Sequence, residues 1–110
     1  VHDGRRLLIE AHPMSTTIFL EVALRDDAAD VEEIIRETLA QTTAFPGCES
    51  LEVLIDDADP TKYIVVEKWA TTADHDSYIA WRGTPEGRSR LGEILAAPPV
   101  TRQFEKTVAL

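Results

Sequence analysis

Three side chains that can move a proton or bind an oxyanion recur at helical spacing in the second half of the chain. His75 and Tyr78 lie three residues apart and Arg82 follows Tyr78 by four, so a helix would place all three on one face. Histidine can act as a general base near neutral pH, tyrosine can donate or relay a proton, and arginine can bind an oxyanion. The alternatives are a solvated histidine between two aspartates, a tyrosine covering a helix–sheet junction and an arginine paired with an acid. The stripe is therefore a candidate site with a structural alternative at each position.

A second candidate group lies just before this stripe. Tyr63, Glu67 and Trp69 share one side-chain parity in an extended segment. A carboxylate on a largely buried face needs a hydrogen-bond partner or a functional role. Trp69 can form the wall of a pocket and donate its indole N–H, or it can be a core tryptophan. Phe19 and Trp81 are likewise candidate pocket aromatics or core residues.

No metal site is predicted from the acidic clusters. The turn at 57–61 resembles the start of a calcium loop, but Lys62 stands where that loop needs glycine and its closing glutamate is missing. The Asp-His-Asp run at 74–76 has ligand types, but neighbours on a helix point in different directions and cannot chelate one ion. The chain also has no Gly-rich phosphate loop, G-x-S-x-G elbow or H-E-x-x-H motif. We therefore predict a reaction that uses neither a metal ion nor a nucleotide.

Length and charge limit the partners. With 110 residues and a formal charge of −9, we expect one domain over 16–110, preceded by an N-terminal arm over 1–15. An acidic surface repels phosphate backbones, so nucleic acid and anionic membranes are not expected partners. Cys48 is the single cysteine, which excludes an internal disulfide and fits a reducing cytoplasm. Glu10 interrupts the early apolar run, so no export signal is expected.

The elements that must position these side chains follow from periodicity. Alternation predicts strands over 17–25, 48–57, 63–69 and 101–108, the middle two forming a hairpin. A helical stripe follows a possible cap at 26–27 and ends near 45–47, and a second helix is capped at 71–72 and runs to about Trp81. A third helix should start at Pro85 and bury Leu91, Ile94 and Leu95. The order βαββααβ is that of an α+β, ferredoxin-like antiparallel sheet with helices on one face.

The other face of this sheet needs a cover. It would present Phe19 and part of the strand at 63–69. In that strand Ile64, Val65 and Val66 are consecutive, so apolar side chains point to both faces of the sheet. Soluble monomers rarely expose so large an apolar surface, and a two-fold dimer is the simplest way to cover it. In the alternative, residues 1–13 roof a pocket on this face. We expect a homodimer.

Three motifs, in this order and spacing, carry a resemblance to a known family. They are Phe-Pro-Gly-Cys at 45–48, Asp-Ala-Asp-Pro at 57–60, and the segment 63–69 with Glu-Lys-Trp at its end, followed directly by a helix. Over about 16–108 the chain resembles the antibiotic biosynthesis monooxygenase family, the dimeric α/β barrels. The resemblance implies this fold, a dimer, and a pocket between the helices and the sheet near Trp69.

What the resemblance implies about activity leaves alternatives open, because fold alone does not fix function. Family members that are enzymes oxidise phenolic or quinol substrates with O₂ and no cofactor, while relatives degrade haem or only bind ligands. Many members have a histidine about nine residues after the tryptophan; Tyr78 stands there in this chain, which argues against haem ligation. We expect a cofactor-independent monooxygenase for a phenolic aromatic, with Trp69 and Tyr78 in the pocket and His75 or Glu67 as base. The alternatives are a non-catalytic ligand-binding module and, third, a haem-degrading enzyme.

Overall fold

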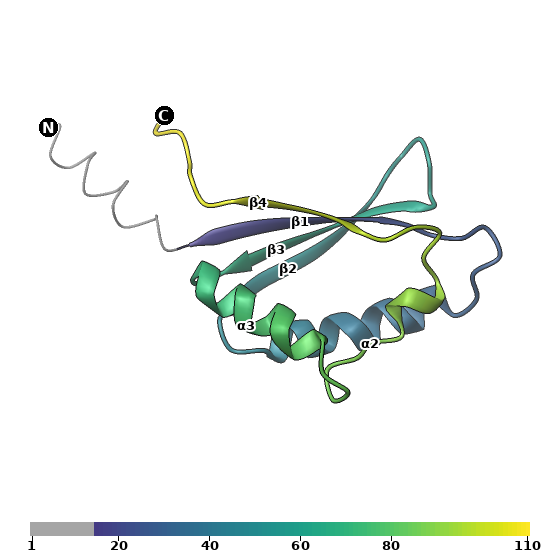
Figure 1. Cartoon of the computed structure of the whole chain (residues 1–110). Coiled ribbons are helices and arrows are strands. Elements are labelled where there is room, and N and C mark those ends of the chain that lie inside the picture. Colours follow the sequence, from purple (N-terminus) through teal and green to yellow (C-terminus); the bar gives the residue numbers. More distant parts are fainter. Residues whose placement is uncertain (1–14) are drawn as a thin grey trace, which may run out of the picture.

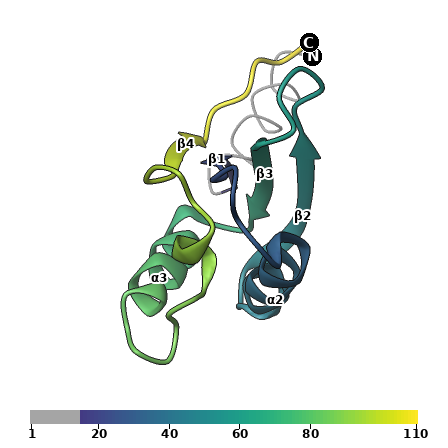
Figure 2. The ribbon, with the colours of Figure 1, turned by 90° about the vertical axis from the view of Figure 1, so that its right-hand side faces the viewer.

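The computed structural model describes residues 15–110, so residues 1–14 of the predicted arm (1–15) lie outside the described residues, as does the alternative role of residues 1–13 as a roof. The strands are β1 (Thr16–Ala23), β2 (Cys48–Ile55), β3 (Lys62–Trp69) and β4 (Val100–Phe104), and they form one antiparallel sheet in the order β2-β3-β1-β4. Helices α2 (Val31–Ala44) and α3 (Thr72–Arg82) lie on the same side of that sheet (Figures 1 and 2). The predicted ferredoxin-like α+β fold is confirmed.

Strand register decides which side chains face the helices. In the β1–β3 pair, Ile18 lies opposite Glu67 and Leu20 opposite Val65, all on the helix side, because parity alternates along each strand. Phe19 lies opposite Val66 on the outer side. The predicted parity of Glu67 and Trp69 is therefore confirmed, and the outer face is apolar where the sequence predicted it.

The core on the helix side is divided into two clusters. One packs Val22, Leu24 and Ile34 against Ile94, at the end where α2 begins. The other packs Ile18, Trp69 and Tyr78, with Phe45 and Trp81 at its margin. The two clusters lie toward opposite ends of β1, with Val22 in the first and Ile18 in the second.

The two helices begin differently. Thr71 caps α3 as predicted, since its side chain accepts a hydrogen bond of 3.0 Å from the backbone N–H of Asp74. The predicted cap of α2 at 26–27 is wrong: that helix starts at Val31, after Asp30 in a left-handed backbone conformation and with no side-chain cap bond. None of the helices in the described residues is both long and apolar enough to cross a membrane.

The third predicted helix is replaced by a loop and one 3₁₀ turn, η1 (Leu91–Glu93). Gly87 and Gly92 lower the helical propensity of this segment. The Thr84 hydroxyl bonds the Trp81 carbonyl at 2.6 Å and accepts from the Gly87 N–H at 3.2 Å, which stabilises a turn instead. Of the three residues predicted to be buried, Ile94 is 1% exposed, whereas Leu91 and Leu95 are half-buried against the same cluster. The last strand is also shorter than expected and ends at Phe104.

Candidate active site

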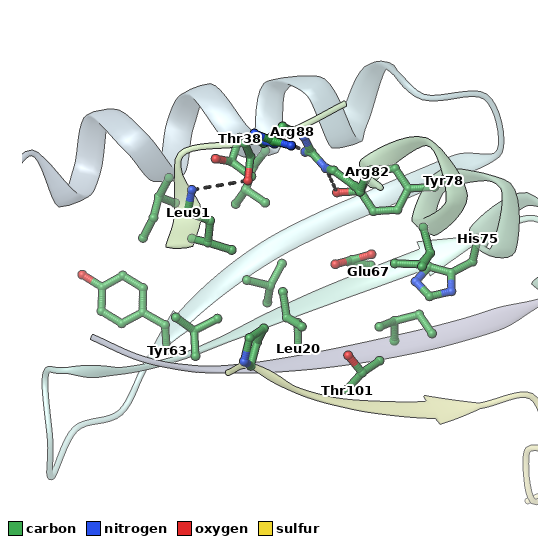
Figure 3. A pocket seen from close by; sticks show the side chains of 18 residues that line it. Leu20, Thr38, Tyr63, Glu67, His75, Tyr78, Arg82, Arg88, Leu91 and Thr101 are labelled. Atoms are coloured by element: carbon green, nitrogen blue, oxygen red, sulfur yellow. Dashed lines mark hydrogen bonds between the residues drawn. The ribbon is translucent and has the colours of Figure 1, made fainter. Parts of the chain in front are cut away.

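A cavity of about 390 Å³ lies between the helices and the sheet, in the gap between the two core clusters (Figure 3). Apolar side chains of β1, β3, α2 and η1 form most of its wall. Polar groups gather toward the end near α3, where Glu67, His75, Tyr78 and Arg82 meet. A cavity that is mostly apolar with a few convergent polar groups is typical of a small-molecule site.

Glu67 projects from β3 into this cavity. It is 4% exposed, and its Oε1 accepts a hydrogen bond of 2.9 Å from Nε1 of Trp69. Burial raises the pKa of the Glu67 carboxyl above its ordinary value, while the Trp69 hydrogen bond and the positive charge of Arg82 offset part of the rise. Glu67 makes no other side-chain hydrogen bond in the described residues, so its second oxygen is available to a ligand.

His75 lines the cavity beside Glu67 and is 5% exposed, so the interpretation of a solvated surface histidine is wrong. Its ring packs edge-on against Trp69, with centroids 5.4 Å apart. Burial lowers the pKa of the His75 imidazole, and the negative charge of Asp76 opposes that shift. A neutral imidazole is the form that can accept a proton.

Tyr78 and Arg82 are joined in one hydrogen-bond network with α2. The Nε–H of Arg82 donates to the Tyr78 hydroxyl at 2.8 Å, and that hydroxyl lies 2.7 Å from Oγ1 of Thr42. Arg82 also donates through Nη1 to Gln41 and the Gly87 carbonyl, and through Nη2 to Thr42 and the Thr38 carbonyl. The guanidinium thus fixes the Tyr78 hydroxyl and holds α3 against α2, where the sequence suggested an ion pair or an oxyanion site.

The structure brings together five of the eight side chains predicted for the site. The cavity is lined by Tyr63, Glu67, His75, Tyr78 and Arg82. Trp69 is fully buried behind it, where it hydrogen-bonds Glu67 and packs against the rings of His75 and Tyr78. Trp81 packs against Phe45 at 5.6 Å without lining the cavity, and Phe19 lies on the opposite sheet face against Phe104, because its strand parity points outward.

Four polar residues that line the cavity were not predicted to belong to the site: Thr38, Arg88, Ser89 and Thr101. Thr38 belongs to the predicted stripe of α2, but a threonine among apolar residues gives no functional signal. Arg88 and Thr101 come from the 83–90 loop and β4, whose positions beside the cavity depend on the tertiary fold. No cluster of three or more His, Cys, Asp or Glu side chains able to hold a metal occurs within residues 15–110.

A model of one protein family, described as antibiotic biosynthesis monooxygenase, matches residues 15–89. The chain belongs to the antibiotic biosynthesis monooxygenase family. No curated protein matches the sequence. The family membership agrees with the resemblance carried by the three sequence motifs.

Solved structures share the fold of this family member at low sequence identity. A conserved protein from Methanosarcina mazei Go1 aligns with a TM-score of 0.72 and 16% identity, over 89% of this chain and 98% of the other. Rv0793 from Mycobacterium tuberculosis gives 0.69 and 18%, over 86% and 97%. SnoaB, a cofactor-independent oxygenase from Streptomyces nogalater, gives 0.72 and 16%, over 87% and 96%. At these identities the likeness shows the fold alone.

Proposed function

We propose that this protein is a cofactor-independent monooxygenase that oxidises a phenolic or quinol-type aromatic with O₂. The observation that carries the proposal is the cavity in which two acid–base groups, Glu67 and His75, lie at the polar end of an apolar space. Family membership and the fold shared with SnoaB support it.

The reaction needs little from the protein if the substrate supplies the electrons. A base in the cavity removes the phenol proton, and the electron-rich phenolate reduces O₂ and forms a bond from a ring carbon to oxygen. Loss of the hydrogen on that carbon and cleavage of the O–O bond then give a quinone and water, so one oxygen atom enters the product. The protein binds the ring, accepts the proton and excludes water.

The groups at the polar end fit these roles. His75 or Glu67 is the base: burial lowers the pKa of His75, which favours the neutral imidazole that accepts a proton, and raises the pKa of Glu67, which makes its carboxylate a stronger base. Tyr78 is a donor to the developing oxyanion, since its hydroxyl can turn from Thr42 to a ligand while Arg82 holds its oxygen. Trp69 is a positioning residue that fixes the Glu67 carboxyl.

The test measures O₂ uptake with a panel of hydroquinones and hydroxynaphthoquinones, and the incorporation of labelled O₂ into product. We expect uptake by the wild type and a loss of about a hundredfold or more in kcat/KM when the true base is replaced, in Glu67→Gln or His75→Gln. Tyr78→Phe should lower kcat, and Ser77→Ala, on the exposed side of α3, is the matched control. If the wild type takes up O₂ no faster than all three cavity variants do, the proposed enzymatic activity is refuted. Binding without uptake would support the alternative, a non-catalytic ligand-binding module.

We also propose that the protein is a homodimer that pairs the outer faces of two sheets. The outer face carries half-buried Phe19, Ile64 and Val66 and the more exposed Leu54 and Val100. Within residues 15–110 no helix covers this face (Figure 2). A second copy is the simplest cover for it.

A further inference from the structure

The threonines of α2 differ in what their hydroxyl groups do. Thr42 donates to the carbonyl of Thr38 at 3.2 Å, and Thr43 donates to the carbonyl of Ala40 at 3.0 Å. Such bonds to the preceding turn are the ordinary way for a threonine to satisfy its hydroxyl within a helix. The Thr38 hydroxyl makes no hydrogen bond in the described part of the chain.

Thr38 is also shielded from water. The residue is 4% exposed, its Oγ1 is buried, and the side chain lines the cavity. A buried hydroxyl without a partner destabilises the protein, whereas a valine would fill the same space without that cost. The contacts within the folded chain therefore do not account for a hydroxyl at this position.

Arg82, which binds the Thr38 backbone, cannot supply the missing partner. Arg82 reaches the Thr38 backbone carbonyl through Nη2 at 2.8 Å, but its five hydrogen bonds engage all three of its nitrogens. A guanidinium has five N–H groups, so none is left for the Thr38 hydroxyl. The Thr38 side chain lines the cavity, so a bound ligand is a partner that the hydroxyl can reach by rotation about χ1.

We propose that Thr38 is a specificity-determining residue whose hydroxyl binds a second oxygen substituent on the substrate. This inference rests on the proposed function and names its substrate class: a dihydroxy or hydroxy-keto aromatic, in contrast to a simple phenol. Thr38 lies on the α2 side of the cavity and Glu67 on the sheet side (Figure 3). An aromatic ring bound between α2 and the sheet can hydrogen-bond both Thr38 and Glu67 only if it carries oxygen substituents at two positions. Threonine in a helix populates two rotamers, so the hydroxyl can turn toward the ligand.

The test compares two ligands that differ by one oxygen, naphthohydroquinone and α-naphthol, with binding measured by calorimetry under nitrogen so that no oxidation occurs. The wild type should bind naphthohydroquinone more tightly. Thr38→Val should weaken the binding of naphthohydroquinone roughly 3- to 10-fold, the loss expected for one hydrogen bond, and leave the affinity for α-naphthol unchanged. Thr38→Ser, which keeps the hydroxyl, should retain the preference. Thr43→Val is the matched control, because it makes the same change on the exposed side of the same helix.

The outcomes separate this inference from the proposed function. Equal weakening of both ligands in Thr38→Val, or no weakening of either, overturns the role of Thr38 while the cavity remains a ligand site. Failure of the wild type to bind either compound overturns both proposals. Thr38→Val should unfold at the same temperature as the wild type or higher, because it removes an unpaired buried hydroxyl.

Discussion

Burial shifts the acid–base groups of the cavity in opposite directions for one reason. Removal from water disfavours the charged form, which is the ionised carboxylate for Glu67 and the protonated imidazole for His75. Strand parity and helical spacing singled out both side chains as candidates, and the fold brings both to the cavity. The pKa shifts could not be predicted, because they depend on how deeply the fold buries each group.

Replacement of Glu67 by glutamine should change how stability depends on pH. The folded-state pKa of Glu67 is raised above the ordinary 4.5, so its contribution to stability is present below that value and is lost as pH rises through the folded-state pKa. Glutamine can still accept the Trp69 hydrogen bond and cannot ionise. We therefore expect Glu67→Gln to melt higher than the wild type at pH 7 and the two to converge near pH 4. A constant difference across this range, measured by thermal unfolding, would contradict the raised pKa.

Arg82 should contribute more to stability than its partial exposure suggests. Its guanidinium makes five hydrogen bonds that link α3 to α2 and to the following loop, and lysine cannot reproduce that planar arrangement. We expect Arg82→Lys to lower the free energy of unfolding by about 2–3 kcal/mol, as two or three hydrogen bonds are lost. The control is Arg88→Lys, which changes an exposed cavity arginine with no hydrogen bond or ion pair recorded in residues 15–110, and should stay within about 0.5 kcal/mol. Urea denaturation measures both, and equal losses would contradict the network.

At the scale of elements, local signals predicted those parts of the chain that local chemistry controls. The Thr71 cap and the end of α3 near Trp81 were predicted, since caps depend on nearby residues. The segment from 84 to 95 was not, because its cap and proline favour a helix while its glycines and the Thr84 side-chain bonds favour turns. Leu91 and Ile94 still dock in the core. Hydrophobic positions were thus predicted more reliably than the element that carries them.

The turn after α2 should be intolerant of a side chain at Gly47. Its φ of 95° lies in a region that favours glycine, and a Cβ there would overlap the side chain of Asp74 at the start of α3. We expect Gly47→Ala to destabilise the protein by about 2 kcal/mol or more, from backbone strain and the close approach together. Gly92→Ala is the control, because a Cβ at Gly92 meets no atom within 4 Å. A chemical denaturation midpoint unchanged in Gly47→Ala would mean that α3 does not pack against this turn.

At the scale of the whole molecule, the alternation of the strands predicted the two-layer fold, but it could not predict the cavity. The cavity exists because one core cluster gathers around Ile34 and Ile94 and the other around Trp69, with space left between them. Such a gap depends on packing across elements far apart in sequence. The apolar outer face was predictable, because parity alone places Phe19 and Val66 there.

The apolar outer face of the sheet determines the expected oligomeric state. Val66 lies near the centre of the sheet on β3, opposite Phe19 on β1 and Glu52 on β2, and is half-buried in a single chain. If two sheets pair through this face, Val66→Glu buries a charge without a partner at the interface, which costs several kcal/mol and should yield a monomer. Its side chain does not touch the helix-side core, so the far-UV circular dichroism spectrum should be retained. Ala80→Glu, on the exposed side of α3, should remain dimeric. Light scattering at micromolar concentration should give twice the chain mass for the wild type and the control, and a wild-type monomer would show that the bare face is covered in another way.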